Sequence, residues 1–272
     1  MKNYLNELLE SLKAGYVPAF FLYDTVGSEL YRQRVSQPDY YLYDLERQAI
    51  SNCARYYQGD KLLDIGSGVT DKMDPIKKHY REYWALDIDE ESASAASDNY
   101  IVSDFLNFKN TENYDCFFMG STVSNLRIKD IHQLIKNCGK ITIAADFAKD
   151  DVDKMIRAYT DPQGIGEAME KRGLININNW YGTDFPVDTM TYECIWNPVT
   201  FIVETNLVFR SPHTINLGNT IFNYETGDKI RIGRLRKFMK HQWEWIFNQV
   251  GKVENIYTDD GDEYGIFRIS SS

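Results

Sequence analysis

Residues 61–68 read Lys-Leu-Leu-Asp-Ile-Gly-Ser-Gly, an apolar run that stops at two closely spaced glycines. This pattern predicts a short buried β-strand that ends in a tight turn. Glycine permits unusual turn conformations and lets backbone N–H groups approach a ligand closely. Because doubly wound sheets bind nucleotides at the carboxyl ends of their strands, we expect a ligand site beside Gly66, Ser67 and Gly68.

The chain after this stretch alternates between strand-like and helix-like segments. Strands are predicted at 83–89, 99–104, 114–120 and 140–146, and helices at 72–80, 90–97 and 128–137. Such alternation is typical of an α/β fold whose parallel sheet is covered by helices on both faces. Residues 252–270 read as two strands around an acidic, glycine-containing turn, which predicts a closing antiparallel hairpin.

Other regions do not follow this alternation. Residues 190–223 have period-two patterning and predict an inserted region with strands of its own. The segments 150–172 and 236–250 are predicted to be helical. The basic residues near the start of the second helix are therefore interpreted as a solvated helix face; they are Arg231, Arg234, Arg236, Lys237 and Lys240.

Composition and charge exclude several classes of partner and site. The formal net charge of −10 repels polyanions, so neither nucleic acid nor an anionic membrane surface is an expected partner. The four cysteines are scattered, without a Cys-x-x-Cys pair or paired histidines, so we expect no metal site and no disulfide framework. The N-terminus lacks a signal-peptide pattern and no apolar run reaches membrane-spanning length, which predicts a cytoplasmic protein.

Acidic residues follow the next two predicted strands. Asp87 lies at the end of one strand, and Asp104 with Phe105 at the end of the other. The first carboxylate can accept from ribose hydroxyls, and the second can accept from an adenine amino group. Taken alone, each acid is better explained as a loop cap or a solvated carboxylate. A dinucleotide fingerprint would have a third glycine where this chain has Asp71, so the set favours a methyltransferase cofactor site over a dehydrogenase site.

These residues belong to a longer set of motifs that covers nearly the whole chain. In chain order the motifs are Tyr23-Asp24-Thr25-Val26-Gly27-Ser28-Glu29-Leu30, Pro38-Asp39-Tyr40-Tyr41, Gly66-Ser67-Gly68 with Lys72, Gly120-Ser121-Thr122-Val123-Ser124-Asn125-Leu126, Ala145-Asp146 with Lys149-Asp150, and Arg157-Ala158-Tyr159. By these motifs and their order the chain resembles the histidine Nα-methyltransferase family of ergothioneine biosynthesis. The resemblance implies a class I, Rossmann-like methyltransferase fold and S-adenosylmethionine as cofactor.

The resemblance also implies two domains. Residues 51–150 and 236–272 would bind S-adenosylmethionine, while residues 1–50 and 151–235, the latter inserted after the fifth strand, would bind the substrate. Asp87 would hold the ribose and Asp104 the adenine. The other residues expected to bind the cofactor are Gly66, Ser67, Gly68, Lys72, Phe105, Gly120 and Ser121.

Four residues are implied to bind a small-molecule amino acid or amine. Asn125 and Tyr159 would donate to the substrate carboxylate, and Tyr40 would help through its hydroxyl. Tyr23 would accept from the substrate amine. These side chains supply hydrogen bonds without placing a full positive charge beside the sulfonium. Tyr23 and Asn125 are the candidate catalytic residues.

The chain departs from the family pattern where the substrate side chain is bound. Histidine-specific members bind the imidazole through a glutamate and a serine. An ungapped alignment places Gly233 and Leu235 of this chain at those two positions. Thr205 stands where the family has a bulky methionine. A buried imidazole without its acceptor would be unpaired, and the replacements would leave more room. We therefore predict a substrate other than histidine, with a side chain such as indole or phenol.

Alternatives remain open at this point. The same sulfonium could donate its aminocarboxypropyl group to an amine instead of its methyl group. The chain could also be a catalytically idle relative that binds a small amine or a partner protein, which Gly66, Asp87, Asp104 and Asn125 argue against. A nicotinamide oxidoreductase is disfavoured by Asp71. The favoured interpretation is N-methylation of the α-amino group of an amino acid or a related small amine.

Overall fold

The computed structural model describes residues 4–68 and 72–271. The chain divides into two compact units. Unit 1 comprises Met1–Tyr40 and Asp150–Arg236, and unit 2 comprises Tyr41–Lys149 and Lys237–Ser272. The chain therefore crosses between the units after Tyr40, after Lys149 and after Arg236.

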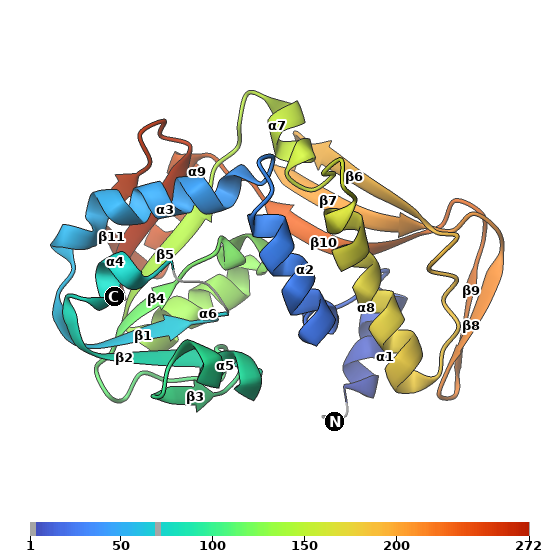
Figure 1. The fold of residues 1–272 in the computed structure, drawn as a ribbon, viewed down its shortest axis with the longest axis horizontal. Helices are drawn as coiled ribbons and strands as arrows, with labels where there is room; N and C mark the ends of the chain where they lie inside the picture. Colours follow the sequence, from blue (N-terminus) through green and yellow to red (C-terminus); the bar gives the residue numbers. More distant parts are fainter. Residues whose placement is uncertain (1–3, 69–71, 272) are drawn as a thin grey trace. The chain divides into compact units, whose positions relative to one another are not determined.

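Unit 2 is built on a mostly parallel sheet, which in the described part of the chain has seven strands in the order β11-β12-β5-β4-β1-β2-β3 (Figure 1). The strands are β1 (Gly59–Ile65), β2 (Tyr80–Asp87), β3 (Tyr100–Val102), β4 (Asp115–Phe118), β5 (Lys140–Asp146), β11 (Gly251–Thr258) and β12 (Tyr264–Ser271). Strands β1 to β5 pair in parallel, whereas β12 is antiparallel to both β5 and β11. The predicted α/β fold with its closing hairpin is confirmed.

Helices and short 3-10 turns complete unit 2. They are α3 (Tyr41–Cys53), η2 (Ala54–Tyr56), α4 (Asp74–Lys77), α5 (Glu90–Ala96), η3 (Thr122–Asn125), α6 (Ile128–Cys138) and α9 (Lys240–Asn248). Successive strand residues point to opposite faces of the sheet. Leu63 and Phe118 therefore join one core with α6 and α9, while Leu62 and Phe117 join a second core with α3. Burial on both faces explains why consecutive residues are apolar at Leu62 and Leu63 in β1 and at Phe117 and Phe118 in β4.

The observed boundary near α3 differs from the predicted domain boundary. The sequence-based division placed residues 1–50 together, but the structure assigns α3 to unit 2. Ala49 and Ile50 are fully buried in the core that also contains Leu62 and Ile266. The apolar face of α3 is thus buried against the sheet of unit 2, and the boundary falls at residue 40.

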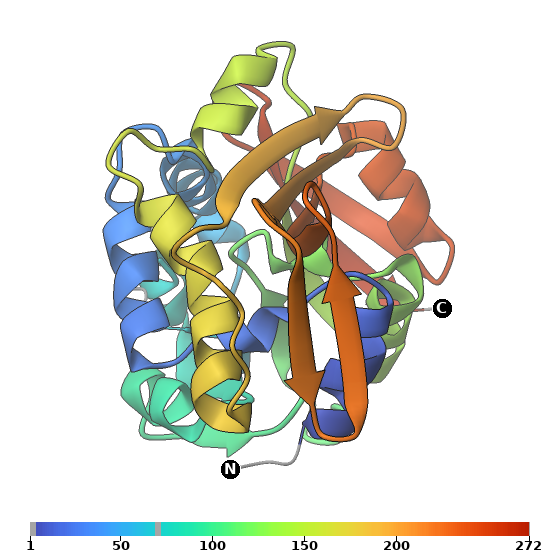
Figure 2. The same ribbon diagram turned by 90° about the vertical axis from the view of Figure 1, so that its right-hand side faces the viewer.

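Unit 1 combines helices with antiparallel strands (Figure 2). Its elements are α1 (Leu5–Lys13), η1 (Ala19–Leu22), α2 (Thr25–Val35), α7 (Val152–Arg157), α8 (Ile165–Tyr181), β6 (Thr191–Asn197), β7 (Ile202–Val208), β8 (His213–Leu217), β9 (Thr220–Tyr224) and β10 (Lys229–Arg236). Strands β10, β7 and β6 form one sheet, and β8 with β9 forms a separate hairpin, seen in front in Figure 2. The insertion therefore has strands of its own, as predicted, and they cover a core that includes Leu8, Phe21 and Leu174.

The predicted helix at 150–172 is divided in two. Helix α7 ends at Arg157, and α8 begins at Ile165. The connecting segment contains Pro162, which cannot continue a helix, and Gly164, whose φ is +72°. The Asp161 carboxylate accepts from the N–H groups of Gly166 and Ile165 over 2.6 Å and 3.0 Å, so it caps the start of α8.

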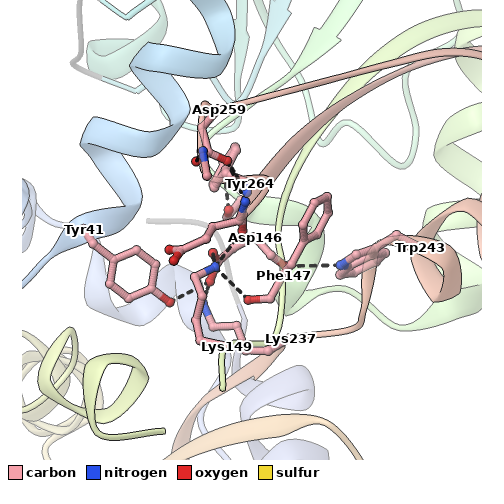
Figure 3. A network of polar contacts seen from close by, with 11 residues as sticks. Tyr41, Asp146, Phe147, Lys149, Lys237, Trp243, Asp259 and Tyr264 are labelled. Atoms are coloured by element: carbon pink, nitrogen blue, oxygen red, sulfur yellow. Dashed lines mark hydrogen bonds and ion pairs between the residues drawn. The ribbon is translucent and has the colours of Figure 1, made fainter. Parts of the chain in front are cut away.

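The predicted helix at 236–250 begins later than expected. Strand β10 continues to Arg236, and α9 starts at Lys240. Of the five basic residues, three therefore lie on β10, Lys237 lies in the connecting segment and only Lys240 lies in the helix, so their interpretation as a solvated helix face is wrong. Lys237 is fully buried, where its ammonium donates to Asp146 Oδ2 over 2.5 Å (Figure 3). An internal ion pair takes the place of the expected solvation of this lysine.

Candidate functional site

The turn after β1 has the backbone geometry that its glycines permit. Gly66 and Gly68 have φ values of +65° and +58°, in the left-handed region. The Gly66 N–H donates to Leu86 O over 2.7 Å, which fastens the turn to the end of β2. Ser67 is buried, and its hydroxyl has no hydrogen-bond partner in the described part of the chain. A buried hydroxyl without a partner is unfavourable, so the turn fits a polar ligand that supplies the missing bond.

Asp87, the last residue of the neighbouring strand β2, bonds to the backbone of the glycine turn. Its carboxylate accepts from the backbone N–H groups of Asp89, Gly68 and Ile88, the first of these over 3.1 Å. Burial raises the pKa of Asp87 and the backbone hydrogen bonds oppose this rise. Asp89 instead caps α5, because its carboxylate accepts from Ser92 N–H over 2.9 Å. The structure therefore brings Asp87 and the glycine turn together and gives Asp89 a structural role.

Asp104 and Phe105 lie in the loop that follows β3. One oxygen of Asp104 accepts from a backbone N–H two residues along the chain over 2.9 Å, so this oxygen is a loop cap. The Ser103 N–H donates to Asp87 O over 3.0 Å and ties the loop to the end of β2. The ring of Phe105 packs on Phe118, with the ring centroids 5.2 Å apart. The two acids thus belong to adjoining strand ends, as the sequence predicted.

Lys72 and the Gly120–Ser121 turn are joined by Glu46, a residue that the sequence analysis did not single out. The Gly120 N–H donates to Glu46 Oε1 over 2.5 Å, and Lys72 Nζ lies 3.4 Å from Glu46 Oε2. The Ser121 hydroxyl donates to the Tyr264 hydroxyl over 2.9 Å. The sequence signal for Glu46 is an acid at helical spacing from the apolar residues Leu42, Ala49 and Ile50. Asn125, in contrast, is exposed at the end of η3.

Asp64 is a buried acid just before the glycine turn. Its Oδ2 accepts from the Tyr83 hydroxyl over 2.8 Å. Burial raises the pKa of Asp64 to about 6, although Lys72 and Tyr83 act in the opposite direction. This carboxyl therefore takes up a proton at a higher pH than an exposed aspartate does.

In unit 1, Tyr40 and Tyr159 pack around a buried arginine. Their ring centroids are 6.4 Å apart in an edge-to-face arrangement, and the Arg34 guanidinium lies 5.2 Å and 4.8 Å from the two centroids. Arg34 pairs with the buried Glu170 at 3.6 Å. Burial raises the pKa of Glu170, whereas Arg34 and the hydroxyl of Thr205 lower it. The sequence analysis missed this pair because nothing in local periodicity links α2 to α8.

Thr205 and Gly233 lie opposite each other on β7 and β10. A Cβ atom on Gly233 would lie 2.4 Å from Thr205 Oγ1, so the threonine fills the space where a side chain at position 233 would begin. Leu235 lies two residues along β10, opposite Val203. The structure therefore offers no additional room at Gly233 itself, contrary to the expectation from the sequence.

Tyr23 lies between η1 and α2 and is 49% exposed. Its ring packs edge-on against Tyr31, with the centroids 6.3 Å apart. The next residue, Asp24, accepts from Gly27 N–H over 2.8 Å and pairs with Arg172 at 2.5 Å. Asp24 thus caps α2 and fastens the segment that carries Tyr23 to α8.

The predicted site residues divide between the two units. Those expected to bind the cofactor, together with Asn125, belong to unit 2, and the other substrate candidates belong to unit 1. Asp71, on which the argument against a dinucleotide rested, lies outside the described residues. A hollow of about 330 Å³ in unit 1 contains none of the predicted residues; it is lined by Ile175, Asn178, Asn179, Phe185, Pro186, Val187, Asp188 and Thr189.

The described residues contain neither a cluster suited to a metal ion nor a helix suited to span a membrane. Within residues 4–68 and 72–271, no group of three or more His, Cys, Asp or Glu side chains could hold a metal ion. In the same part of the chain, every helix is too short or too polar to cross a membrane.

Comparison with known proteins supplies the family. The model of the family "Histidine-specific methyltransferase, SAM-dependent" matches residues 4–271. The N-methyltransferase imqF of Aspergillus flavus is 23% identical over 307 aligned residues, covering 96% of this chain and 83% of that protein. The histidine N-alpha-methyltransferase of Mycobacterium tuberculosis is 25% identical over 248 residues, covering 79% of this chain and 77% of that protein.

A solved structure supports the fold. The PH0226 protein from Pyrococcus horikoshii OT3 superposes with a TM-score of 0.51 at 11% identity, covering 92% of this chain and all of that one. At this identity the likeness concerns the fold alone, whereas the family match spans nearly the whole sequence. The chain belongs to the histidine-specific, S-adenosylmethionine-dependent methyltransferase family, and it is an S-adenosylmethionine-dependent N-methyltransferase.

Proposed function

We propose that this enzyme methylates the α-amino group of an amino acid or a closely related small amine other than histidine, with an indole or phenol side chain. The observation that argues against histidine is the Thr205–Gly233 pair. The threonine hydroxyl occupies the place where a side chain at position 233 would begin, so no acceptor for an imidazole can extend from there. A histidine side chain buried against this position would find the hydroxyl of Thr205 but no carboxylate acceptor extending from position 233.

The cofactor is assigned to unit 2 on its buried polar groups. Asp87 would accept from the ribose hydroxyls and Asp104 from the adenine amino group, with Phe105 beside the base. The glycine turn and Lys72 would hold the methionine end, where the unpartnered hydroxyl of Ser67 supports a polar ligand. When bound, S-adenosylmethionine supplies an electrophilic methyl group on a sulfonium. The residues present fit this cofactor.

The proposed residues that bind the substrate carboxylate are uncharged hydrogen-bond donors. Asn125, Tyr40 and Tyr159 would bind the carboxylate, and Tyr23 would accept from the amine. Arg34 beside the two tyrosines is paired with Glu170, so the pair adds no net charge to this part of unit 1. This arrangement supports a small zwitterionic substrate over an anionic one.

The chemistry requires a neutral nitrogen, because an ammonium has no lone pair to attack the methyl carbon. Free amino acids are mostly ammonium at neutral pH, so the site must favour loss of that proton. Burial disfavours the ammonium, and an acceptor such as the Tyr23 hydroxyl can orient the neutral amine. Most of the rate should then come from alignment of nitrogen, carbon and sulfur in a site that excludes water.

Two further assignments belong to the same proposal. In this proposal unit 1 binds most of the substrate and unit 2 binds the cofactor, with Asn125 as the substrate candidate that belongs to unit 2. The reaction takes place in a reducing cytoplasm, which the free state of Cys53, Cys116, Cys138 and Cys194 supports. The relative from Aspergillus flavus is an N-methyltransferase, which supports transfer of the methyl group to a nitrogen atom.

A screen of the amino acids and of biogenic amines with S-adenosylmethionine, read by mass spectrometry, tests the proposal. We expect an aromatic amino acid to gain one or more methyl groups. A product that gains the aminocarboxypropyl unit would reveal the alternative transfer. Cofactor binding without any product would indicate an idle relative. Efficient methylation of histidine with no aromatic preference would overturn the proposed specificity.

A further inference from the structure

Glu46 is a carboxylate placed among the apolar residues of α3. Its side chain is 3% exposed, and the helix positions around it, such as Leu42, Ala49 and Ile50, form the buried face of α3. A buried carboxylate is strongly unfavourable unless it is paired and hydrogen-bonded. The partners of Glu46 therefore explain why an acid occupies this position.

Those partners come from two different loops. Oε1 accepts from the Gly120 N–H over 2.5 Å, in the turn after β4. Oε2 lies 3.4 Å from the ammonium of Lys72, which follows the glycine turn after β1. Lys72 is itself 7% exposed, so both charges of this pair are removed from water. Glu46 thus links the loops at the carboxyl ends of two neighbouring parallel strands.

The turn that Glu46 holds has an unusual backbone. Gly120 and Ser121 have φ values of +77° and +53°, and for serine this conformation is strained. A Cβ on Gly120 would lie 2.8 Å from Lys72 Nζ, so the lysine amine packs directly on the glycine. On the other side, the Ser121 hydroxyl donates to Tyr264, whose own hydroxyl also interacts with Glu46. Contacts with Glu46 and Tyr264 therefore maintain the strained conformation.

This turn leads directly to the candidate substrate residue. Ser121 precedes η3, and the Ser124 N–H donates back to Ser121 O over 2.9 Å. The short 3-10 turn ends at Asn125. Since η3 has only four residues, a shift at Ser121 would displace Asn125 as well.

We infer that Glu46 is a positioning residue, which sets Lys72 and the Gly120–Ser121 turn for the methionine end of the cofactor and, through η3, sets Asn125 for the substrate. Glu46 acts through these groups and needs no contact with the reacting atoms. The inference rests on the proposed function, which assigns Lys72 and the turn to the cofactor.

Calorimetric binding of S-adenosylhomocysteine tests this role without catalysis. Glu46→Gln keeps the size of the side chain and an oxygen for the Gly120 N–H, but it removes the charge opposite Lys72. We expect Glu46→Gln and Lys72→Met each to weaken binding about tenfold or more, because charge-assisted bonds in a buried site are lost. The double variant should bind no more weakly than the weaker single variant, since Glu46 acts through Lys72. Fully additive losses would overturn the inference.

Asp44→Asn is the matched control, because it makes the same acid-to-amide change at an exposed position of α3. Its affinity for S-adenosylhomocysteine should equal that of the unaltered enzyme. A second readout is the amino-acid KM at saturating cofactor, which Glu46→Gln should raise through displacement of Asn125. An unchanged KM would show that Glu46 does not position Asn125 through η3.

Asp87→Asn separates failure of this inference from failure of the proposed function. If Asp87→Asn and Lys72→Met leave binding intact, the cofactor assignment is wrong and the role of Glu46 falls with it. If both weaken binding and Glu46→Gln does not, only the role of Glu46 is refuted. If Glu46→Gln does not fold, Tyr264→Phe provides a second test, because it removes the hydroxyl that holds the Gly120–Ser121 turn through Ser121. Unchanged cofactor binding and unchanged KM in Tyr264→Phe would refute the inference.

Discussion

Asn125 carries the sharpest prediction at the scale of single residues. The proposal gives it the substrate carboxylate and no contact with the adenosine. Asn125→Ala should raise the KM for the amino acid about tenfold or more, because a charged group loses a donor, while cofactor affinity changes by less than about twofold. Steady-state kinetics and calorimetry with S-adenosylhomocysteine measure the two quantities. A parallel loss of both affinities would contradict the role of Asn125.

Asp64 should make the stability of the protein depend on pH. Burial raises the pKa of this carboxyl from 3.8 to about 6. As the pH rises, the unfolded chain therefore loses this proton first, and the folded state loses relative stability between about pH 4 and pH 6. A shift of this size corresponds to about 3 kcal/mol once the pH exceeds the folded-state pKa.

Urea unfolding of the unaltered protein and of Asp64→Asn between acidic and neutral pH measures this contribution. The variant cannot ionise at position 64, so its free energy of unfolding should improve relative to the original as the pH rises, and the difference should become constant at neutral pH. The difference that remains at acidic pH, where both side chains are neutral, reports the other effects of the substitution, including any change in the bond from the Tyr83 hydroxyl. A difference independent of pH throughout would mean that Asp64 keeps an ordinary pKa in the folded protein.

Glycine positions provide a prediction at the scale of helices. Gly27 lies in the first turn of α2, where a Cβ would come within 1.7 Å of Leu22 O, a backbone atom that cannot move aside. Gly173 lies in α8, where the nearest atom to a Cβ is the flexible Leu22 Cδ1 at 3.3 Å. Gly27→Ala should lower the free energy of unfolding by about 3 kcal/mol or more, whereas Gly173→Ala should change it by less than about 1 kcal/mol. Urea denaturation compares the two, and equal effects would refute the close contact.

Local pattern predicted some elements well and others poorly. Strand β5 was predicted with its observed bounds, since its mostly apolar residues 141–145 are bounded by Lys140 and Asp146. The third strand is shorter than predicted, because Ser103 and Asp104 turn away from β2 after their backbone bond to it. The break between α7 and α8 was missed, although Pro162 marks it. Periodicity finds the interior of an element more reliably than its ends.

At the scale of the whole molecule, one buried carboxylate anchors every crossing between the units. Tyr41, Lys149 and Lys237 are the residues of unit 2 at the three crossings. Asp146 Oδ2 accepts from the Tyr41 hydroxyl and from Lys237 over 2.9 Å and 2.5 Å, and Oδ1 accepts from Lys149 over 2.7 Å (Figure 3). Burial alone would raise the pKa of Asp146, but the two lysines hold it below its ordinary value. Asp146 therefore determines where all three connections leave unit 2.

Removal of this charge should destabilise the protein strongly. Asp146→Asn leaves two buried lysines without their counter-charge, which should cost about 3–5 kcal/mol of unfolding free energy. Asp262→Asn is the matched control, because its pair with Lys240 is exposed and should contribute less than about 1 kcal/mol. Urea denaturation at neutral pH compares the two variants. Similar small losses would show that the Asp146 network does not anchor the crossings.

The sequence by itself determined the order of strands and helices, the glycine turn with its two acids, and the family, because these depend on local periodicity and on short motifs. Only the tertiary structure decided which buried charges are paired: Glu46 with Lys72, Arg34 with Glu170, and Asp146 with Lys237. It also placed Thr205 in the space beside Gly233 and moved α3 into unit 2. The physical reason is that the partners of a buried ion pair come from distant parts of the chain, and no local pattern marks one for the other.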